Sequence, residues 1–444
     1  MRKPNERLVN WFFRTLCRVQ SITMSARLNA AQLVSVIIGA AIVAFEIITS
    51  IGDSVFGMGA PIIFIGILAI IVPALNEILT IRRNNVSHII NTSRMYHDGV
   101  IDRLSLSPEY EESGYRKRPY DDCGTTEWHV DSLQVNAMLL EGSVDADKAL
   151  PLTEKKPAFS LPDEVRPLAS GIIKRMLQGS KNRRFFNGKL TRLGSDLLVD
   201  SWDSTIVQKT RYFDGQCTHE IVYKRVSNTD SLEDNFLGER LLLDDGDCMV
   251  GLWASRCANF MGSSTIAITS DGYLLVGTQG GQSMANANRL APSGSGSVEY
   301  SDFTKLKASP DANTLQNLVI RAAERELREE CALPEGAGLR SRVIGYTRLL
   351  ERGGKPDFFC VTRIGITEAE VMESFEQRQR AAEVALGCRP ISVKVAEDQT
   401  ASAALFGFLD EVRRETPDKH RISIQLQLCA EYLEAAEPIL GSWL

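Results

Sequence analysis

The chain has 444 residues, of which 44% are apolar and 24% are charged, and its formal net charge at neutral pH is −6. This mildly acidic balance excludes a protein built for bulk nucleic-acid binding, which requires an excess of Lys and Arg. The nine cysteines show neither Cys-x-x-Cys nor Cys/His spacing of the kind that binds zinc. They are typical of buried thiols in a reducing compartment.

The N-terminal segment, residues 1–27, is basic and contains the aromatic run Leu8-Val9-Asn10-Trp11-Phe12-Phe13-Arg14. This composition predicts an amphipathic helix on an anionic membrane surface. Two uncharged runs follow, from Leu28 to Phe45 and from Ser54 to Asn76. Because a hydrocarbon core about 30 Å thick needs about 20 residues, the runs predict two transmembrane helices, near 28–50 and 56–77. A buried hairpin of a soluble domain is the alternative interpretation.

Basic residues flank both runs on the outside, with Arg27 before the first and Arg82 and Arg83 after the second. The short connection carries Asp53 but no cation. By the positive-inside rule, this pattern predicts a multi-pass membrane protein with both termini in the cytoplasm. Residues 28–80 are therefore interpreted as a two-helix membrane anchor.

The segment 81–160 is predicted as a helical exit from the membrane, Asn84 to Leu104, followed by a polar linker, Ser105 to Pro157. Residues 161–259 then alternate between helical and strand patterns and predict an α+β extension. Its expected elements are a helix over Val165 to Leu177 and strands over Lys189 to Val199 and Ile221 to Arg225.

The densest basic and aromatic cluster outside the predicted anchor is Lys181 to Lys189, which contains Arg183, Arg184 and two phenylalanines. Cations beside stacking rings suit the phosphate and base of a nucleotide, so Arg183 and Arg184 are candidate ligand-binding residues. A solvated loop is the alternative for this cluster.

From Ser264 to Val276 two β-rich runs are joined by Asp271-Gly272, a combination that predicts a hairpin. A Gly- and Ser-rich stretch, Leu290 to Glu299, follows and is predicted as a loop. Its Gly294 and Gly296 are candidate ligand-binding residues, because glycine-rich loops can present backbone N–H groups to phosphates.

Arg321 to Leu333 consists of good helix formers and carries Glu326, Glu329 and Glu330 at i, i+3 and i+4. That spacing places three carboxylates on one helical face, where they repel one another unless a cation lies among them. Carboxylate oxygens suit Mg²⁺ or Mn²⁺, so the three glutamates are candidate metal ligands. A solvated charged helix is the alternative interpretation.

Arg325-Glu326-Leu327-Arg328-Glu329-Glu330-Cys331-Ala332-Leu333 resembles the second half of the Nudix box, in which Ala332 takes the place of a glycine. A second hairpin pattern, Val343 to Leu350 and Phe358 to Ile364 around Gly353-Gly354, completes the order of elements expected of that fold. The resemblance departs upstream, where Asp311 and Asn317 occupy the positions of the box's glycine and first glutamate. About fifteen residues are inserted if Gly296 is the loop glycine.

The resemblance implies that residues 260–444 are an α/β Nudix-like domain, an α-β-α sandwich with an N-terminal α+β extension. It further implies that Glu326 positions or activates water, that Arg325 orients the carboxylates, and that Mg²⁺ or Mn²⁺ is the cofactor. In this interpretation the chain is a membrane-tethered Nudix pyrophosphohydrolase of nucleoside diphosphate derivatives.

The whole predicted layout, two membrane helices followed by a Nudix-like domain, resembles one class of effector in cyclic-oligonucleotide-based anti-phage signalling (CBASS). That resemblance implies a homo-oligomer in the bacterial inner membrane that senses a nucleotide second messenger and disrupts membrane lipid during abortive infection. The altered loop before the acidic helix, with its inserted residues and its departures at Asp311 and Asn317, favours this sensing function over hydrolysis. A Nudix-like scaffold without a ligand is a third possibility.

Overall fold

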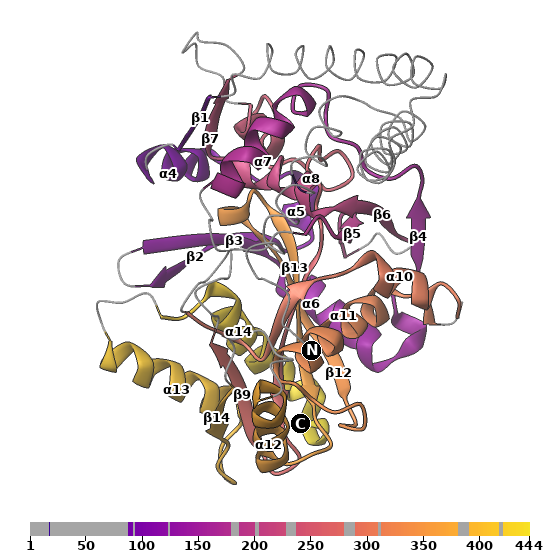
Figure 1. Ribbon diagram of the computed structural model, residues 1–444, viewed down its shortest axis with the longest axis vertical. Coiled ribbons are helices and arrows are strands. Elements are labelled where there is room, and N and C mark those ends of the chain that lie inside the picture. Colours follow the sequence, from indigo (N-terminus) through magenta and orange to yellow (C-terminus); the bar gives the residue numbers. More distant parts are fainter. Residues whose placement is uncertain are drawn as a thin grey trace, which may run out of the picture. The chain divides into compact units, whose positions relative to one another are not determined.

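The computed structural model describes Cys17 and residues 88–91, 94–122, 125–178, 186–199, 204–227, 237–278, 289–309, 312–380, 390–416 and 421–444. The chain divides into two compact units. The first comprises Met1–Thr92, Leu161–Asn187 and Tyr223–Gly238, and the second comprises Ser93–Ser160, Gly188–Val222 and Glu239–Leu444. Figure 1 shows the elements of both units, which are described separately below.

The described part of the first unit contains one antiparallel strand pair and one helix. Strand β1 (His88–Asn91) pairs with β7 (Lys224–Ser227). Helix α7 (Ala169–Gln178) follows a short 3₁₀ turn, Arg166–Leu168. The side chains of Ala169, Ile172 and Ile173 are buried, and this spacing gives the helix a single apolar face.

The second unit is built on a nine-stranded sheet with the order β10-β9-β8-β13-β12-β3-β2, in which β11 also pairs with β8 and β14 with β9. Its described neighbours are antiparallel except β8 and β13, which run parallel. The strands are β2 (Arg116–Asp122), β3 (Thr125–Asp131), β8 (Gly262–Ile268), β9 (Tyr273–Thr278), β10 (Leu290–Pro292), β11 (Gly294–Ser297), β12 (Arg340–Leu349), β13 (Lys355–Arg363) and β14 (Ile391–Lys394).

A smaller sheet of three strands has the order β4-β6-β5. Its strands are β4 (Leu152–Lys155), β5 (Lys189–Leu193) and β6 (Thr205–Arg211). The helices of the unit are α4 (Arg94–Arg103), α5 (Pro108–Glu112), α6 (Leu133–Val144), α8 (Tyr212–Gln216), α9 (Glu239–Leu242), α10 (Tyr300–Leu306), α11 (Leu315–Glu330), α12 (Glu368–Arg380), α13 (Ala401–Glu415) and α14 (Ile424–Leu440).

Glycines with positive φ close the two hairpins that the sequence predicts. Gly272 (φ +82°) lies between β8 and β9, and Gly353 (φ +59°) and Gly354 (φ +70°) lie between β12 and β13. Only glycine adopts these angles without steric cost, so these positions determine where the chain reverses.

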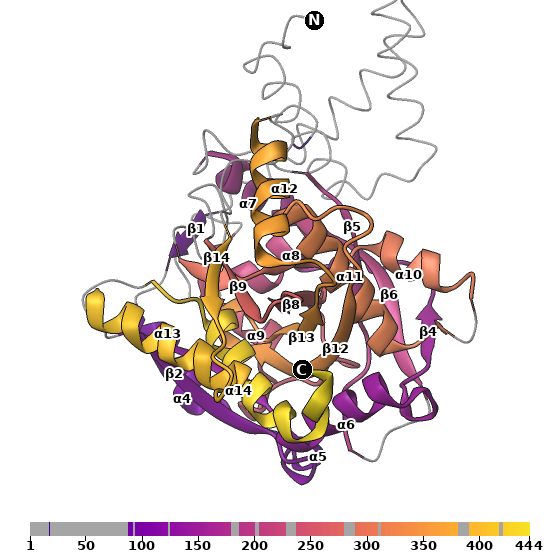
Figure 2. The ribbon, with the colours of Figure 1, turned by 90° about the horizontal axis from the view of Figure 1, so that it is seen from below.

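Helices cover both faces of the large sheet. Side chains of α13 and α14, such as Leu405 and Leu426, pack with Ile266 and Val276 of the sheet in one apolar cluster. Ala267 and Leu275 point to the other face, where they pack with Leu327 of α11 and Val371 of α12. Figure 2 shows α11 and α12 on one side of β8 and β9, and α13 and α14 on the other. The unit is therefore a mixed α/β domain whose large sheet carries an apolar cluster on each face.

The segment predicted as helical exit and linker contributes to this domain. Helix α4 lies within the expected helix Asn84 to Leu104, and β2, β3 and α6 lie within the expected linker. Strand β1, which also lies within the expected helix, belongs to the first unit. The polar composition of this segment suggested a linker. In the structure, most charged side chains of β2 are exposed, while Tyr120 and Asp122 are buried. An edge hairpin with one solvated face has little apolar character, so its sequence resembles that of a loop.

None of the described helices combines the length and the apolar character that crossing a membrane requires. The two predicted spans, near 28–50 and 56–77, lie outside the described residues, as does the predicted surface helix in 1–27. The prediction of a two-helix anchor and of an inner-membrane location is therefore contradicted by the described structure. An uncharged run of sufficient length is necessary for a span, but the length criterion alone did not establish one.

Candidate functional site

The predicted acidic helix exists as α11, which is longer at its start than the sequence pattern indicated. Its first turn is capped by Thr314, whose side chain accepts a hydrogen bond from the Asn317 N–H. Its apolar face is buried and consists of Leu315, Leu318, Val319, Ala322, Ala323 and Leu327. Glu326, Glu329 and Glu330 lie at the C-terminal end of this helix, off its fully buried face.

Ala332, which follows α11, has an unusual backbone conformation. This residue is buried and has φ +57°, a left-handed conformation that favours glycine. The backbone therefore adopts at Ala332 the conformation for which a glycine is suited, although the side chain differs.

The Gly- and Ser-rich stretch forms strands β10 and β11, where the sequence predicted a loop. A Cβ added at Gly294 would lie 2.7 Å from the backbone of Leu327, and one added at Gly296 would collide with the carboxylate of Glu326. The two candidate glycines therefore allow β11 to pack directly against α11. The stretch is a strand because β11 pairs with β8 and β10 with β9, a long-range pairing that the local sequence pattern does not report.

Arg325 is the centre of the charged network at the end of α11. Its Nη2 donates to the Ser297 carbonyl at 2.9 Å and to Asp302 Oδ2 at 3.1 Å. Its Nη1 donates to Glu326 Oε1 at 2.8 Å and lies 3.7 Å from Glu329 Oε1. The guanidinium thus neutralises several carboxylates at once.

Asp302 is the member of this network that the sequence interpretation missed. Its side chain is 2% exposed and accepts from Arg325 and from the Glu299 N–H, which closes a capping box at the start of α10. The sequence offered one signal for Asp302. Acidic residues at the N-cap (Glu299) and three positions later (Asp302) form the pattern of a capping box and mark the start of a helix.

The three glutamates differ in environment. The Glu326 side chain is 15% exposed, whereas that of Glu329 is 63% exposed. Glu330 accepts a hydrogen bond from the Ser295 N–H at 3.0 Å. Burial, followed by the charge of Glu326, raises the pKa of Glu330 to about 8, and burial also raises the pKa of Glu326 against the opposing effect of Arg325. Near neutral pH this end of the helix therefore holds a proton.

Carboxylate oxygens are the right donors for Mg²⁺ or Mn²⁺, and crowded carboxylates with raised pKa values favour a bound cation. Within the described part of the chain, however, no three or more His, Cys, Asp or Glu side chains are grouped so that they could hold a metal ion. Glu326 is held by Arg325, and Glu330 by the backbone of β11. The donor chemistry of Glu326, Glu329 and Glu330 fits a divalent cation, but their present arrangement directs two of them to protein donors.

A cationic cluster lies on the small sheet beside α10. It consists of Lys156, Lys189, Lys209 and Arg211. Lys189 and Arg211 are direct partners across β5 and β6, and Lys209 lies two positions before Arg211, on the same face. Burial lowers the pKa of Lys209, and the positive charges of the other three cluster members lower it further. Positive potential therefore accumulates here, as an anion-binding surface requires.

Tyr300 connects the cationic cluster to the acidic end of α11. The Lys209 ammonium lies 5.4 Å from the centre of the Tyr300 ring, and the Tyr300 hydroxyl donates to Glu154 at 2.5 Å. Tyr300 begins α10, which also carries Asp302, the partner of Arg325. The Thr191 N–H of β5 donates to the Val298 carbonyl, so the small sheet is joined to the chain just after β11.

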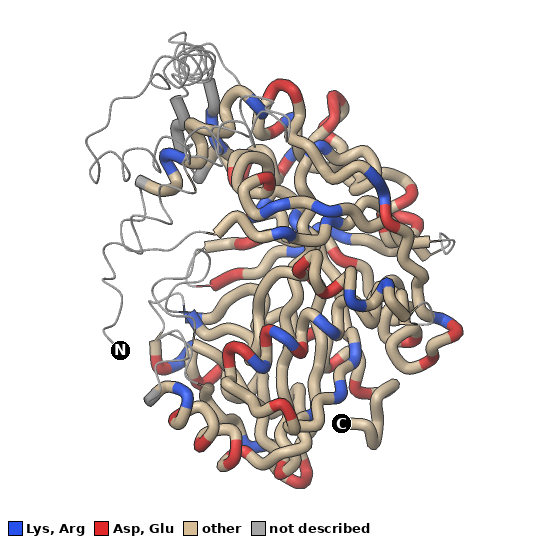
Figure 3. Tube along the Cα trace, turned by 45° about the vertical axis from the view of Figure 1, so that its right-hand side comes forward, with Lys and Arg blue, Asp and Glu red and all other residues tan. Residues whose placement is uncertain are grey.

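Arg183 and Arg184, the predicted basic ligand-binding residues, lie outside the described residues. Figure 3 shows Lys and Arg interspersed with Asp and Glu along the described chain. The cationic cluster as a whole was not predicted, because only the pairing of β5 with β6 brings Lys189 beside Lys209 and Arg211.

No family model matches the chain, and no curated protein matches it. Among solved structures, the crystal structure of DR0079 from Deinococcus radiodurans is similar at 16% sequence identity. The match covers 43% of this chain and 96% of that one, with a TM-score of 0.22.

Proposed function

We propose that the second unit is a Nudix-like nucleotide-recognition domain that senses a cyclic oligonucleotide messenger of anti-phage signalling. One observation carries the proposal: the cationic cluster of Lys156, Lys189, Lys209 and Arg211 is connected through Tyr300 and α10 to the box-like end of α11. A nucleotide offers both phosphate anions and donor-bearing sugars and bases, so it can use cations and carboxylates that lie near each other.

The cationic cluster would bind phosphate groups, since Lys189 and Arg211 are exposed. Glu154 is the nearest counter-charge, and it is already engaged. Burial acts to raise the pKa of Glu154. Hydrogen bonds from Lys307, Tyr300 and Lys156 outweigh burial and lower this pKa to about 2. Lys189, Lys209 and Arg211 make no ion pair among the described residues, so a ligand's phosphates would not displace one.

The acidic end would face the uncharged parts of the ligand. Glu329 is mostly exposed and can accept hydrogen bonds from ribose hydroxyls or base N–H groups. Glu330 keeps its proton at neutral pH because its pKa is about 8, so this region repels a nearby phosphate less than three ionised carboxylates would.

Sensing is favoured over turnover by the engagement of the inner carboxylates. Glu326 is paired with Arg325, and Glu330 accepts from Ser295. These contacts position the side chains as parts of a fixed surface. A sensor also needs two states with different affinities for the ligand, and we propose that the assembly state of a homo-oligomer is what changes.

The second candidate function is divalent-cation-dependent hydrolysis of nucleoside diphosphate derivatives. It is favoured by the raised pKa values of Glu326 and Glu330, which a cation would relieve. Glu326, Glu329 and Glu330 would hold Mg²⁺ or Mn²⁺, and the cation would neutralise diphosphate charge. Arg325 would keep Glu326 oriented through its simultaneous contacts with Asp302 and Ser297.

The decisive experiment is a titration of the full chain with cyclic di- and trinucleotides, and with linear nucleoside diphosphates, each with and without Mg²⁺. We expect a cyclic oligonucleotide to bind without being consumed and to change the sedimentation coefficient. Lys189→Gln and Arg211→Gln should each weaken binding roughly fivefold, the equivalent of about 1 kcal/mol. Lys394→Gln, an exposed cation on β14, is the matched control and should leave affinity unchanged.

Two results would decide against sensing. If no cyclic oligonucleotide binds, or if Lys189→Gln and Arg211→Gln bind it as the parent does, the cationic cluster is not the phosphate site. Mg²⁺-dependent release of phosphate from linear substrates, abolished by Glu329→Gln together with Glu330→Gln, would establish the hydrolase instead.

A further inference from the structure

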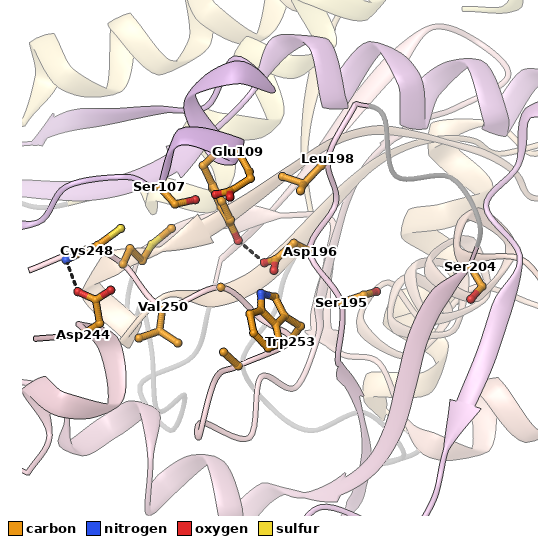
Figure 4. Close-up of a pocket in the computed structure, with 14 residues that line it drawn as sticks. Ser107, Glu109, Ser195, Asp196, Leu198, Ser204, Asp244, Cys248, Val250 and Trp253 are labelled. Carbon is orange, nitrogen blue, oxygen red and sulfur yellow. Dashed lines mark hydrogen bonds between the residues drawn. The ribbon is translucent and has the colours of Figure 1, made fainter. Parts of the chain in front are cut away.

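A cavity of about 620 Å³ lies in the second unit, separate from the acidic end of α11. Three segments distant in sequence form its wall: the start of α5 with Ser107 and Glu109, the stretch after β5 with Asp196, and the loop after α9 with Asp244 and Trp253. Figure 4 shows these side chains around the cavity. None of them belongs to the site described above.

The lining has one sign of charge and one large aromatic surface. It carries three carboxylates, Glu109, Asp196 and Asp244, and the described residues that line it include no Lys, Arg or His. Trp253 is 73% exposed, so most of its indole is available to a ligand. An acidic cavity repels phosphates and carboxylates, whereas an indole face beside carboxylates attracts cations.

Asp196 is held in place by groups behind it. The Tyr110 hydroxyl and the Leu252 N–H both donate to its Oδ1, the latter at 2.6 Å. A Cβ added at Gly251 would lie 2.7 Å from Oδ2, so only glycine leaves room for the carboxylate there. Buried Arg348 donates to the Tyr110 hydroxyl at 3.1 Å and to the Val250 carbonyl at 2.9 Å, which fixes Tyr110 in turn.

Asp244 is oriented in the same manner. Its Oδ1 accepts from the N–H groups of Gly246 and Cys248, both at 2.9 Å. In both aspartates one oxygen is thus used by the protein, while Oδ2 accepts no hydrogen bond from the described residues. Two carboxylates that each keep one unused acceptor oxygen in one cavity form a prepared site for a multiple donor.

We propose that this cavity binds a guanidinium group, which stacks on Trp253 and donates hydrogen bonds to the carboxylates. A guanidinium is planar, so it can lie on the indole face, and its five N–H donors form a fork that matches carboxylate oxygens. A single ammonium group has the required positive charge, but it is not planar and cannot stack on the indole in the same way. The proposal is independent of the nucleotide-recognition function, because it uses other residues and the opposite sign of charge.

Isothermal titration calorimetry of the full chain with arginine amide tests the proposal, with citrulline amide as the control. Citrulline has a neutral urea of nearly the same shape in place of the guanidinium. We expect arginine amide to bind about tenfold or more tightly than citrulline amide, and its affinity to fall as salt is added. A blocked tripeptide, acetyl-Gly-Arg-Gly-amide, separates the two sources of the group: tighter binding of the tripeptide indicates a protein partner, and tighter binding of arginine amide indicates a free metabolite.

Variants locate the site. Trp253→Leu should weaken arginine amide roughly threefold to tenfold, and Glu109→Gln should weaken it in the same direction. Both side chains are exposed, and melting curves of the variants check that the fold is kept. Equal affinity for arginine amide and citrulline amide in the parent chain would overturn the proposal without any variant, and so would unchanged binding in folded Trp253→Leu.

Discussion

The two groups of carboxylates in the second unit are opposites in construction. Glu326, Glu329 and Glu330 come from one helix end, and burial raises the pKa of Glu330 to about 8. Glu109, Asp196 and Asp244 come from three segments, and the hydroxyl of Ser107 lowers the pKa of Glu109. The first group is crowded and requires Arg325 and a proton. The second is spread over a cavity wall, where donors of the protein orient two of its members.

Acidic residues that are close in the sequence can therefore influence one another's ionisation more than acidic residues brought together from separate segments. Residues at i, i+3 and i+4 of a helix are close enough to act on one another's charge even where their exposure differs, whereas residues from separate loops can each be given their own donors. Substitutions and changes of pH that act on one group at a time can test this contrast.

Replacing Arg325 with Met should be the most damaging change. Asp302, which is 2% exposed, and the half-buried Glu326 would lose their counter-charge and would remain as uncompensated carboxylates. Removing one partner of such a network costs about 3–5 kcal/mol of unfolding free energy. Urea denaturation measures the loss.

The matched control for Arg325→Met is Arg328→Met, in the same helix. Arg328 is 38% exposed and lies 4.0 Å from Glu324, so its loss should cost less than about 1 kcal/mol. Equal destabilisation by the two variants would show that Arg325 does not hold the acidic end together.

Glu330 should make the chain less stable as pH rises. Its pKa is raised from 4.5 to about 8 in the folded state, so between these values the folded chain binds a proton that the unfolded chain has lost. Stability then decreases with pH over this window, by up to about 5 kcal/mol, and levels off above pH 8. Glu330→Gln removes the titrating group, so its unfolding free energy should depend less on pH than that of the parent.

Denaturant titrations at pH 5 and pH 8 make this measurement. A parent chain that is equally stable at both values, or a Glu330→Gln variant with the same slope, would contradict the coupled environment of the first group. Added Mg²⁺ should selectively stabilise the parent at pH 8 if the carboxylates hold a cation.

In the second group, Asp196→Ala should cost about 2 kcal/mol for a different reason. It leaves the Tyr110 hydroxyl and the Leu252 N–H without their acceptor, and a buried donor that lacks a partner costs about 1–3 kcal/mol. Asp196→Asn keeps an acceptor oxygen and should recover most of the stability. Thermal melting compares the two, and equal losses would indicate that charge rather than hydrogen bonding matters at this position.

Local signals explain which parts were predictable from the sequence. Asp271-Gly272 and Gly353-Gly354 predict the two hairpins because positive φ is a property of single residues. The helix containing Glu326 is predicted because its formers are contiguous, although its start at Leu315 was placed too late. The helical spacing of Arg325 and the three glutamates likewise predicts that they lie together at one helix end.

Long-range contacts explain what was not predictable. Gly294 and Gly296 suggested a loop, yet they lie in a strand that pairs with β8, and α11 approaches both residues closely. Asp302 is related to Arg325 only through the packing of α10 on α11, and Lys189 is related to Arg211 only through the register of β5 and β6. Asp196 and Trp253 share a cavity that no spacing in the sequence indicates.

The smallest predicted effect concerns the end of α11, where Ala332 has φ +57°. A non-glycine residue in the left-handed region costs about 1–2 kcal/mol, and part of any gain from glycine is lost to the greater freedom of the unfolded chain. Ala332→Gly should therefore stabilise the chain by about 0.5–1 kcal/mol, as measured by urea denaturation. Ala337→Gly is the control. Ala337 is also buried, but it is not among the described residues with positive φ, so glycine there should destabilise the chain. A loss of stability in Ala332→Gly would mean that packing of the Ala332 methyl group contributes more than its backbone conformation costs. The backbone at this position would then give no reason to expect the glycine of the Nudix box.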